Sequence, residues 1–302
     1  MKKFIFVVAI FSFIQFAHSA SREMVKYVPQ NALIVVGADF TALRTCDIFN
    51  QLEKEGKVWS FNEKNDLTPY LKALNLNPTD IQSSLYAKYL NSYGNKGEFH
   101  LFEISRDLNS YLQSKSATPY LGSKLYRLKE DDDLYVTTVE PSVIAVGSFT
   151  GVKMAVDVMQ HKEKTIKDEA TLNPLLEKVP PAAGVWGISQ PLSRQEASSR
   201  GADQSTNAML EAFHHYYFFG VPAAHNIRTH FVGIAKGESE ATFVRTFMIG
   251  MLTFAKLKAE NQEVADALDQ ITVDRNGNSI HVNALVNSSM VDAYLKGKLG
   301  VN

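Results

Sequence analysis

One short pattern occurs twice in this chain, and it constrains the fold more than any other feature. Residues 28–38 read VPQNALIVVGA, and residues 179–189 read VPPAAGVWGIS. In each copy a Val-Pro pair precedes a short apolar run of the kind that forms a buried strand. The two pairs lie 151 residues apart. The repeat therefore predicts two similar halves, each beginning with a buried strand.

The residues that follow each copy predict one shared order of elements, β-α-β-β-α-β-β-α. In the first half the expected helices and hairpins are helix 41–52, hairpin 81–104, helix 106–113, hairpin 125–139 and helix 150–161. In the second half they are helix 208–219, hairpin 226–249, helix 251–269, hairpin 271–286 and helix 288–298. The first half also has an extra strand at 143–146 and an extra helix at 172–178.

This order predicts an α+β fold made of two ferredoxin-like (split βαβ) repeats, in which helices cover antiparallel sheets. The expected domains are residues 20–178 and 179–302, because the prolines after Val179 end the preceding helix near Lys178. The second domain contains a polar, Ser-rich stretch at residues 192–207, which we expect to be a surface loop.

The first residues predict a secretory signal peptide. Two lysines precede an apolar run over residues 4–17, and small residues at Ala17 and Ser19 suit a signal peptidase. The run is interrupted by Ser12 and Gln15 and is too short to span a membrane. We therefore expect cleavage after Ser19, a periplasmic or extracellular location, and no transmembrane segment in the mature chain.

Charge limits the possible partners of the chain, and cysteine content limits its disulfides. The whole chain has 31 Lys and Arg against 32 Asp and Glu, and removal of residues 1–19 leaves 29 against 32, a formal charge of −3. A nearly neutral chain without a basic cluster is not expected to bind nucleic acid. Its one cysteine, Cys46, cannot form a disulfide within the chain, and we expect a buried, unreactive thiol.

The densest aromatic run is FHHYYFFG at residues 213–220. If the run is helical, its aromatic side chains occupy more than one stripe, and Gly220 is placed to end the helix. We expect these side chains to form either the interface between the two halves or an exposed patch for a partner. The candidate interface residues are Phe213, Tyr216, Tyr217 and Phe219.

Four histidines near this run are a possible metal site. Zinc sites use converging histidines at recognisable spacings, and none of those spacings is present. The preferred interpretation is structural, with no metal and no cofactor. The alternative is a metal site drawn from His214, His215, His225 and His230.

The sequence contains no motif for nucleophilic catalysis, phosphate binding or dinucleotide binding. The favoured function is an exported, non-enzymatic binding or scaffolding protein whose partner is an envelope or extracellular protein. Two alternatives stay open. One is a hydrolase or metal-dependent enzyme with its site in the cleft between the repeats. The other is a sensor or inhibitor that pairs through a sheet edge.

Three segments together carry a resemblance: VPQNALIVVGADF at residues 28–40, LYVTTVEPSVIAVGSFTGVKMAV at residues 134–156, and LLEKVPPAAGVWGI at residues 175–188. With the expected signal peptide, this chain resembles uncharacterised exported bacterial proteins built from two similar α+β halves. The resemblance implies a compartment and an architecture. It implies no activity and no site residues.

Overall fold

The computed structural model describes residues 22–56, 58, 67–91, 93–129, 132–190, 209, 211–257, 259 and 262–295. The expected signal peptide (1–19) and the expected polar loop (192–207) lie outside these described residues.

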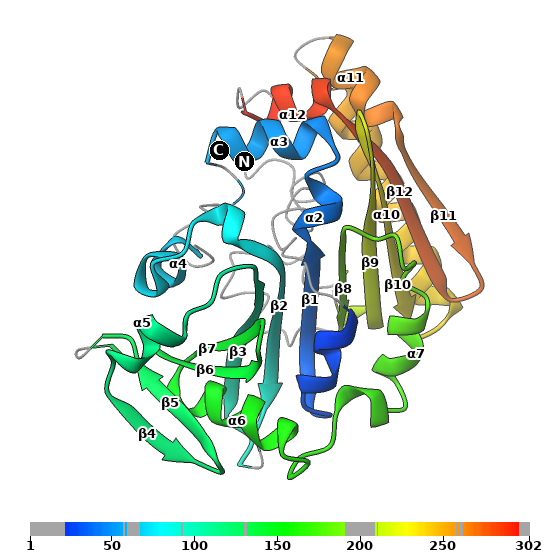
Figure 1. Cartoon of the computed structure of the whole chain (residues 1–302). Helices are drawn as coiled ribbons and strands as arrows, with labels where there is room; N and C mark the ends of the chain where they lie inside the picture. Colours follow the sequence, from blue (N-terminus) through cyan, green and yellow to red (C-terminus); the bar gives the residue numbers. More distant parts are fainter. Residues whose placement is uncertain are drawn as a thin grey trace.

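The described strands form one continuous antiparallel sheet of twelve strands, with the order β11-β12-β10-β9-β8-β1-β2-β3-β7-β6-β5-β4 (Figure 1). The two edge strands are β11 and β4. The strand bounds are β1 (Ala32–Asp39), β2 (Ile81–Leu90), β3 (Lys96–Ile104), β4 (Ala117–Tyr120), β5 (Ser123–Arg127), β6 (Tyr135–Glu140), β7 (Val143–Gly147), β8 (Val185–Ser189), β9 (Phe213–Ala223), β10 (Asn226–Ala235), β11 (Ile271–Asn276) and β12 (Ser279–Asn287).

Helices cover both sides of the sheet. The bounds are α2 (Phe40–Leu43), α3 (Asp47–Lys54), α4 (Thr68–Leu74), α5 (Asn109–Gln113), α6 (Phe149–Met159), α7 (Leu172–Glu177), α10 (Glu238–Leu257), α11 (Gln262–Asp269) and α12 (Ser288–Leu295), with 3-10 turns η1 (Arg22–Tyr27), η2 (Pro78–Asp80) and η3 (Ile166–Asp168).

The two sides of the sheet have separate cores because successive strand residues point to opposite faces. Val36 of β1 packs with α3, α4 and α5 on one side, here called the α3 face. Val35 packs with η1, α6 and α7 on the other side, here called the α6 face. In the second half, α10 and α11 pack on β10, β11 and β12 from the α3 face.

The two halves repeat one strand order on either side of the β1–β8 pair. Moving outward, the first half has β1, β2, β3, β7 and β6, and the second has β8, β9, β10, β12 and β11. Val36 lies opposite Gly187 in the β1–β8 ladder, and these residues are 151 apart, as are Val28 and Val179. A local two-fold axis therefore passes through the Val36–Gly187 pair.

The α+β class, with helices on an antiparallel sheet, is confirmed. The strand order differs from a split βαβ unit, in which another strand separates the two strands of each β-α-β unit. Here β1 and β2 are direct antiparallel neighbours, and α2, α3 and α4 lie between them in the chain (Figure 1). The halves also share one sheet.

Two expected elements of the second half are wrong. The expected strand at 241–249 is part of α10, in which Ala241, Val244, Met248, Leu252 and Ala255 are buried at helical spacing. The expected helix at 208–219 is replaced over most of its length by β9, so Gly220 lies within a strand and ends no helix. Burial of aromatic side chains on both faces of β9 removes the alternation that usually identifies a strand.

Glycines in the strands make room for large aromatic side chains on neighbouring strands. A Cβ atom at Gly37 would lie 2.6 Å from the ring of Trp186, its cross-strand partner. A Cβ at Gly187 would lie 2.3 Å from Phe218. Since such contacts are shorter than real Cβ atoms make, the indole and phenyl rings fill the space that the missing side chains leave.

Candidate functional site

The aromatic run predicted as an interface lies on β9, and its side chains divide between the two faces. Phe213 and Tyr216 lie on the α3 face, where both rings contact Phe231 at centroid distances of 6.1 and 5.8 Å. Tyr217 and Phe219 lie on the α6 face with the core around Trp186. Of the four, Phe219 is half-buried and the other three are buried.

The four candidate histidines do not come together. His214 and His215 are neighbours on β9, while His225 lies in the β9–β10 turn, where its Nδ1 is 2.7 Å from Asp47 Oδ2. His230 lies on β10. Among the described residues, no group of three or more His, Cys, Asp or Glu side chains is arranged to hold a metal ion.

Instead, His230 lies beside His281 of β12, which is not one of the four candidate histidines. Their ring centroids are 5.5 Å apart, and His230 also stacks on Phe219 at 5.0 Å. His230 Nδ1 is hydrogen-bonded to Asn283 Oδ1. We call Phe219, His230, His281 and Asn283 the histidine face; it lies on the α6 face of the sheet.

Strand alternation explains how the sequence builds this face. In β12, Ile280, Val282, Ala284 and Val286 are buried, and the residues between them point to the opposite side of the sheet and are half-buried. The tight β11–β12 turn sets the register, and Gly277 supplies the positive φ of 59° that the turn requires. His281 and Asn283 therefore point to the same side as His230.

The two-fold relation shows what the first half has at these positions. Val35 and Trp186 are 151 residues apart and therefore occupy equivalent positions. Following the cross-strand partners outward from each gives two equivalent rows, Val35–Ala87–Phe99–Gly147–Tyr135 and Trp186–Phe219–His230–Asn283–Thr272. The next row places His281 at the position equivalent to Ala145. The first-half counterparts Phe99, Ala145 and Gly147 are buried, whereas His230, His281 and Asn283 are partly exposed.

Two histidines on the α6 face have lowered pKa values. Burial lowers the pKa of His281, with the neighbouring His230 contributing, and Asp274 partly opposes the shift. Burial likewise lowers the pKa of His215, with the adjacent His214 contributing. Loss of hydration disfavours the charged imidazolium, so the neutral imidazole is favoured at both positions.

His100 of β3 is a separate histidine, held in an aromatic environment in the first half. Its ring lies 5.0 Å from Tyr70 and 5.1 Å from Tyr86, and it stacks on Phe102. Its Nδ1 is buried and has no hydrogen-bond partner among the described residues. Burial lowers the pKa of His100 to about 4.

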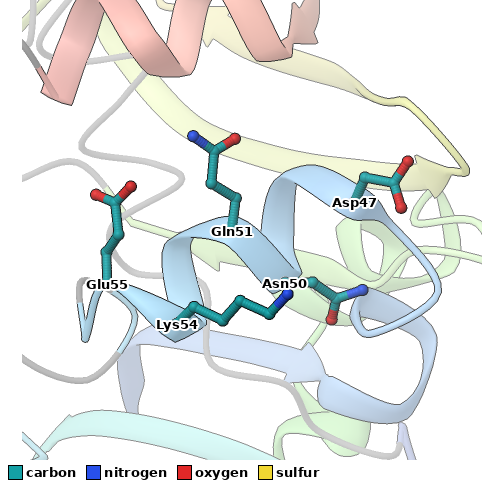
Figure 2. Close-up of a pocket in the computed structure, with 5 residues that line it drawn as sticks. All are labelled: Asp47, Asn50, Gln51, Lys54 and Glu55. Atoms are coloured by element: carbon teal, nitrogen blue, oxygen red, sulfur yellow. The ribbon is translucent and has the colours of Figure 1, made fainter.

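A depression of about 380 Å³ lies along α3 and is lined by Asp47, Asn50, Gln51, Lys54 and Glu55. Figure 2 shows that these side chains fan out from the helix and its C-terminal turn and do not converge on one point. Gln51 donates a hydrogen bond of 3.0 Å to Asp292 of α12, and Asp47 contacts His225. These contacts tie α3 to its neighbours, which is a structural role.

Helix α10 carries large apolar side chains on its outer side. Phe243, Phe254 and Leu257 are 49%, 53% and 79% exposed. With the half-buried Phe247 and with Gly250 they follow the spacing 4-3-4-3 along the helix. We call Phe243, Phe247, Gly250, Phe254 and Leu257 the α10 stripe. The helices of the described residues include none that is long and apolar enough to span a membrane.

The seam between the halves is packed at its centre. β1 and β8 form a ladder of five residue pairs from Ile34–Ser189 to Ala38–Val185. Trp186 covers Gly37 on the α6 face of this ladder. The proposed cleft between repeats therefore does not lie at the β1–β8 contact.

No protein-family model matches this chain, and no curated protein matches it. Solved structures do share its fold. Crystal form I of TP0453 aligns over 93% of this chain and 98% of that chain, with a TM-score of 0.51 and 10% identity. Crystal form III aligns over 90% of this chain and 96% of that chain, with a TM-score of 0.52 and 10% identity. Crystal form IV aligns over 90% of this chain and 95% of that chain, with a TM-score of 0.51 and 8% identity. At these identities the similarity concerns the fold alone.

Proposed function

We propose that this protein is an exported, non-enzymatic scaffolding protein that associates with a second copy of itself through the α10 stripe. The observation that carries the proposal is the 4-3-4-3 spacing of large apolar side chains on an exposed helix. That spacing is the seam along which one helix packs against another. Export rests on the N-terminal residues, and N-terminal sequencing of the secreted or periplasmic protein should begin at Ala20.

Gly250 supports a helix as the occupant. It lies at the middle of the stripe, and a Cβ atom there would meet nothing within 4 Å among the residues that the structure describes. A glycine within an exposed helix costs about 1 kcal/mol relative to alanine. No contact among the described residues accounts for this cost. We infer that glycine stands at this position because the backbone of a second helix approaches closely there.

The symmetry of the stripe supports a second copy. Phe243 and Leu257 each lie seven residues from Gly250, so an antiparallel crossing at Gly250 places Phe243 of one copy against Leu257 of the other. Such a contact is closed and two-fold, the commonest arrangement of homo-oligomers. The chain's own polar stretch at 192–207 lacks the apolar side chains that would match the stripe.

The expected dimer is weak. An aromatic side chain buries about 150–250 Å² when fully enclosed, so the exposed parts of the stripe would bury roughly 1,000 Å² over both copies, near the lower limit of specific interfaces. We therefore expect a concentration-dependent dimer with a dissociation constant in the micromolar range.

Sedimentation velocity of the mature chain over a range from about one to several hundred micromolar tests the proposal. We expect the wild type to shift from monomer to dimer. The double substitution Phe254→Lys and Leu257→Lys should keep the protein monomeric because two charges enter the seam. Tyr93→Lys is the matched control, since Tyr93 is 88% exposed on the β2–β3 hairpin, and it should leave dimerisation unchanged.

A wild type that remains monomeric at the highest concentration overturns the proposal. So does a dimer that survives both lysine substitutions, because its contact must then lie elsewhere. Binding to neutral phospholipid vesicles that needs Phe254 and Leu257, without dimerisation, assigns the stripe to a lipid surface and also overturns it.

A further inference from the structure

We propose that His230 and His281 form a two-ligand site for a divalent transition-metal ion on the histidine face, with water completing the coordination. This site is independent of the α10 stripe and uses a residue, His281, outside the four histidines of the sequence analysis. Among the described residues no group of three or more His, Cys, Asp or Glu side chains is arranged to hold a metal ion, so we assign two protein ligands.

The separation of the two rings fits one shared ion. A metal lies about 2.0–2.1 Å from an imidazole nitrogen, which places it about 3.2 Å from the ring centre; two rings at a tetrahedral angle then have centres about 5 Å apart. The observed centroid separation of His230 and His281 is 5.5 Å. Both residues are partly exposed, which is compatible with access by water and ions.

Asn283 fixes which nitrogen of His230 is available. Asn283 Nδ2 donates to Thr272 Oγ1 at 3.3 Å, so its Oδ1 faces His230 and accepts a hydrogen bond from Nδ1–H. His230 Nε2 therefore carries the lone pair. A ligating histidine typically donates its second N–H to an oxygen acceptor in this way, which fixes its tautomer and its ring orientation.

The comparison of the halves shows that the strand pairing itself does not require these side chains. At the equivalent positions the first half has Phe99 for His230, Ala145 for His281 and Gly147 for Asn283. The same strand pairing thus forms with apolar or no side chains there. Two imidazoles and an orienting amide at one partly exposed place point to a ligand that imidazole prefers, such as Cu²⁺, Ni²⁺ or Zn²⁺.

Isothermal titration of the tag-free mature chain with Cu²⁺ and with Zn²⁺ tests this site. We expect one ion per chain, and Cu²⁺ should bind more tightly than Zn²⁺. His230→Phe and His281→Ala introduce the residues of the first half, so the fold should tolerate them. Each should weaken binding at least tenfold, while His225→Ala, a control in the exposed β9–β10 turn, should not.

A second readout separates coordination from indirect effects. The Cu²⁺ electron paramagnetic resonance spectrum should show coupling to two imidazole nitrogens, and either histidine substitution should reduce this to one. Asn283→Leu should weaken binding about tenfold, because ring orientation is lost. Asn283→Asp keeps an acceptor and should restore the affinity.

Three results overturn the site: no stoichiometric ion bound by the wild type, an equal loss of affinity in His225→Ala, or an unchanged spectrum in both histidine variants. Circular dichroism melts of every variant establish that each is folded. None of these measurements depends on dimerisation, so failure of the metal site and failure of the α10 stripe are distinguishable.

Discussion

His100 shows how one buried residue links stability to pH. Its pKa of about 4 in the folded chain lies below the ordinary value of 6.5, because its aromatic environment disfavours the charged ring. Between these two values the unfolded chain binds the proton more readily than the folded chain. The contribution of His100 to stability is therefore fully present above pH 6.5 and is lost as the pH falls toward 4.

We predict that His100→Phe reduces the pH dependence of folding. At pH 5 protonation of the unfolded chain at this one residue should cost the wild type about 2 kcal/mol relative to pH 7. Urea unfolding at both pH values measures the difference, which should be smaller by about that amount in the variant. An identical pH dependence in both proteins would contradict the assigned environment of His100.

At the scale of elements, α10 shows why a helix can be misread from sequence. Its residues 241–249 include Thr, Phe, Val and Ile, which favour strands, and only the spacing of its buried side chains is helical. It also has two apolar stripes, one packed on the sheet and one exposed. A helix is recognised from sequence by the contrast between one apolar face and one polar face, and a second apolar stripe weakens that contrast.

We predict opposite effects of Gly250→Leu on folding and on association. The free energy of unfolding of the monomer should increase by about 0.8 kcal/mol, because leucine favours a helix more than glycine does. Dimerisation should weaken, because the new side chain lies where two helices would cross. Thermal melts in dilute solution and sedimentation at high concentration measure the two effects. Stronger association of the variant would contradict a close helix crossing.

At the scale of the whole molecule, the β1–β8 ladder joins the two halves. Each of these strands lies at the inner edge of its own half, so separating the halves would expose both edges. Trp186 would also leave Gly37 uncovered. Unpaired edges and exposed apolar surface promote aggregation or strand exchange.

We predict that residues 20–178 do not fold as a stable monomer when produced alone. Size exclusion and urea unfolding should show aggregates, or a dimer paired through β1, without a cooperative monomeric transition. Production together with residues 179–302 is the control and should give a soluble complex that unfolds cooperatively. A cooperative monomer of 20–178 would show that the β1–β8 ladder is dispensable for the first half.

The candidate sites were predictable only in part. Residues 213–219 were selected for their aromatic density, but their division between two faces required the strand assignment of β9. His230 was selected among four histidines, and its partner His281 was missed because 51 residues separate them in the chain. The polar residues of β12 alternate with buried ones, which is the local signal that places His281 and Asn283 on one face.

The sequence alone determined the α+β class, most of the elements and the spacing of the two opening strands. These follow from local periodicity and from a repeat at a fixed distance. The tertiary structure decided that β1 and β8 join the halves into one sheet, that Val36 and Gly187 meet at the two-fold axis, and that His230 lies beside His281. Such pairings depend on which backbone edges and side chains meet across long stretches of chain, and no local pattern specifies them.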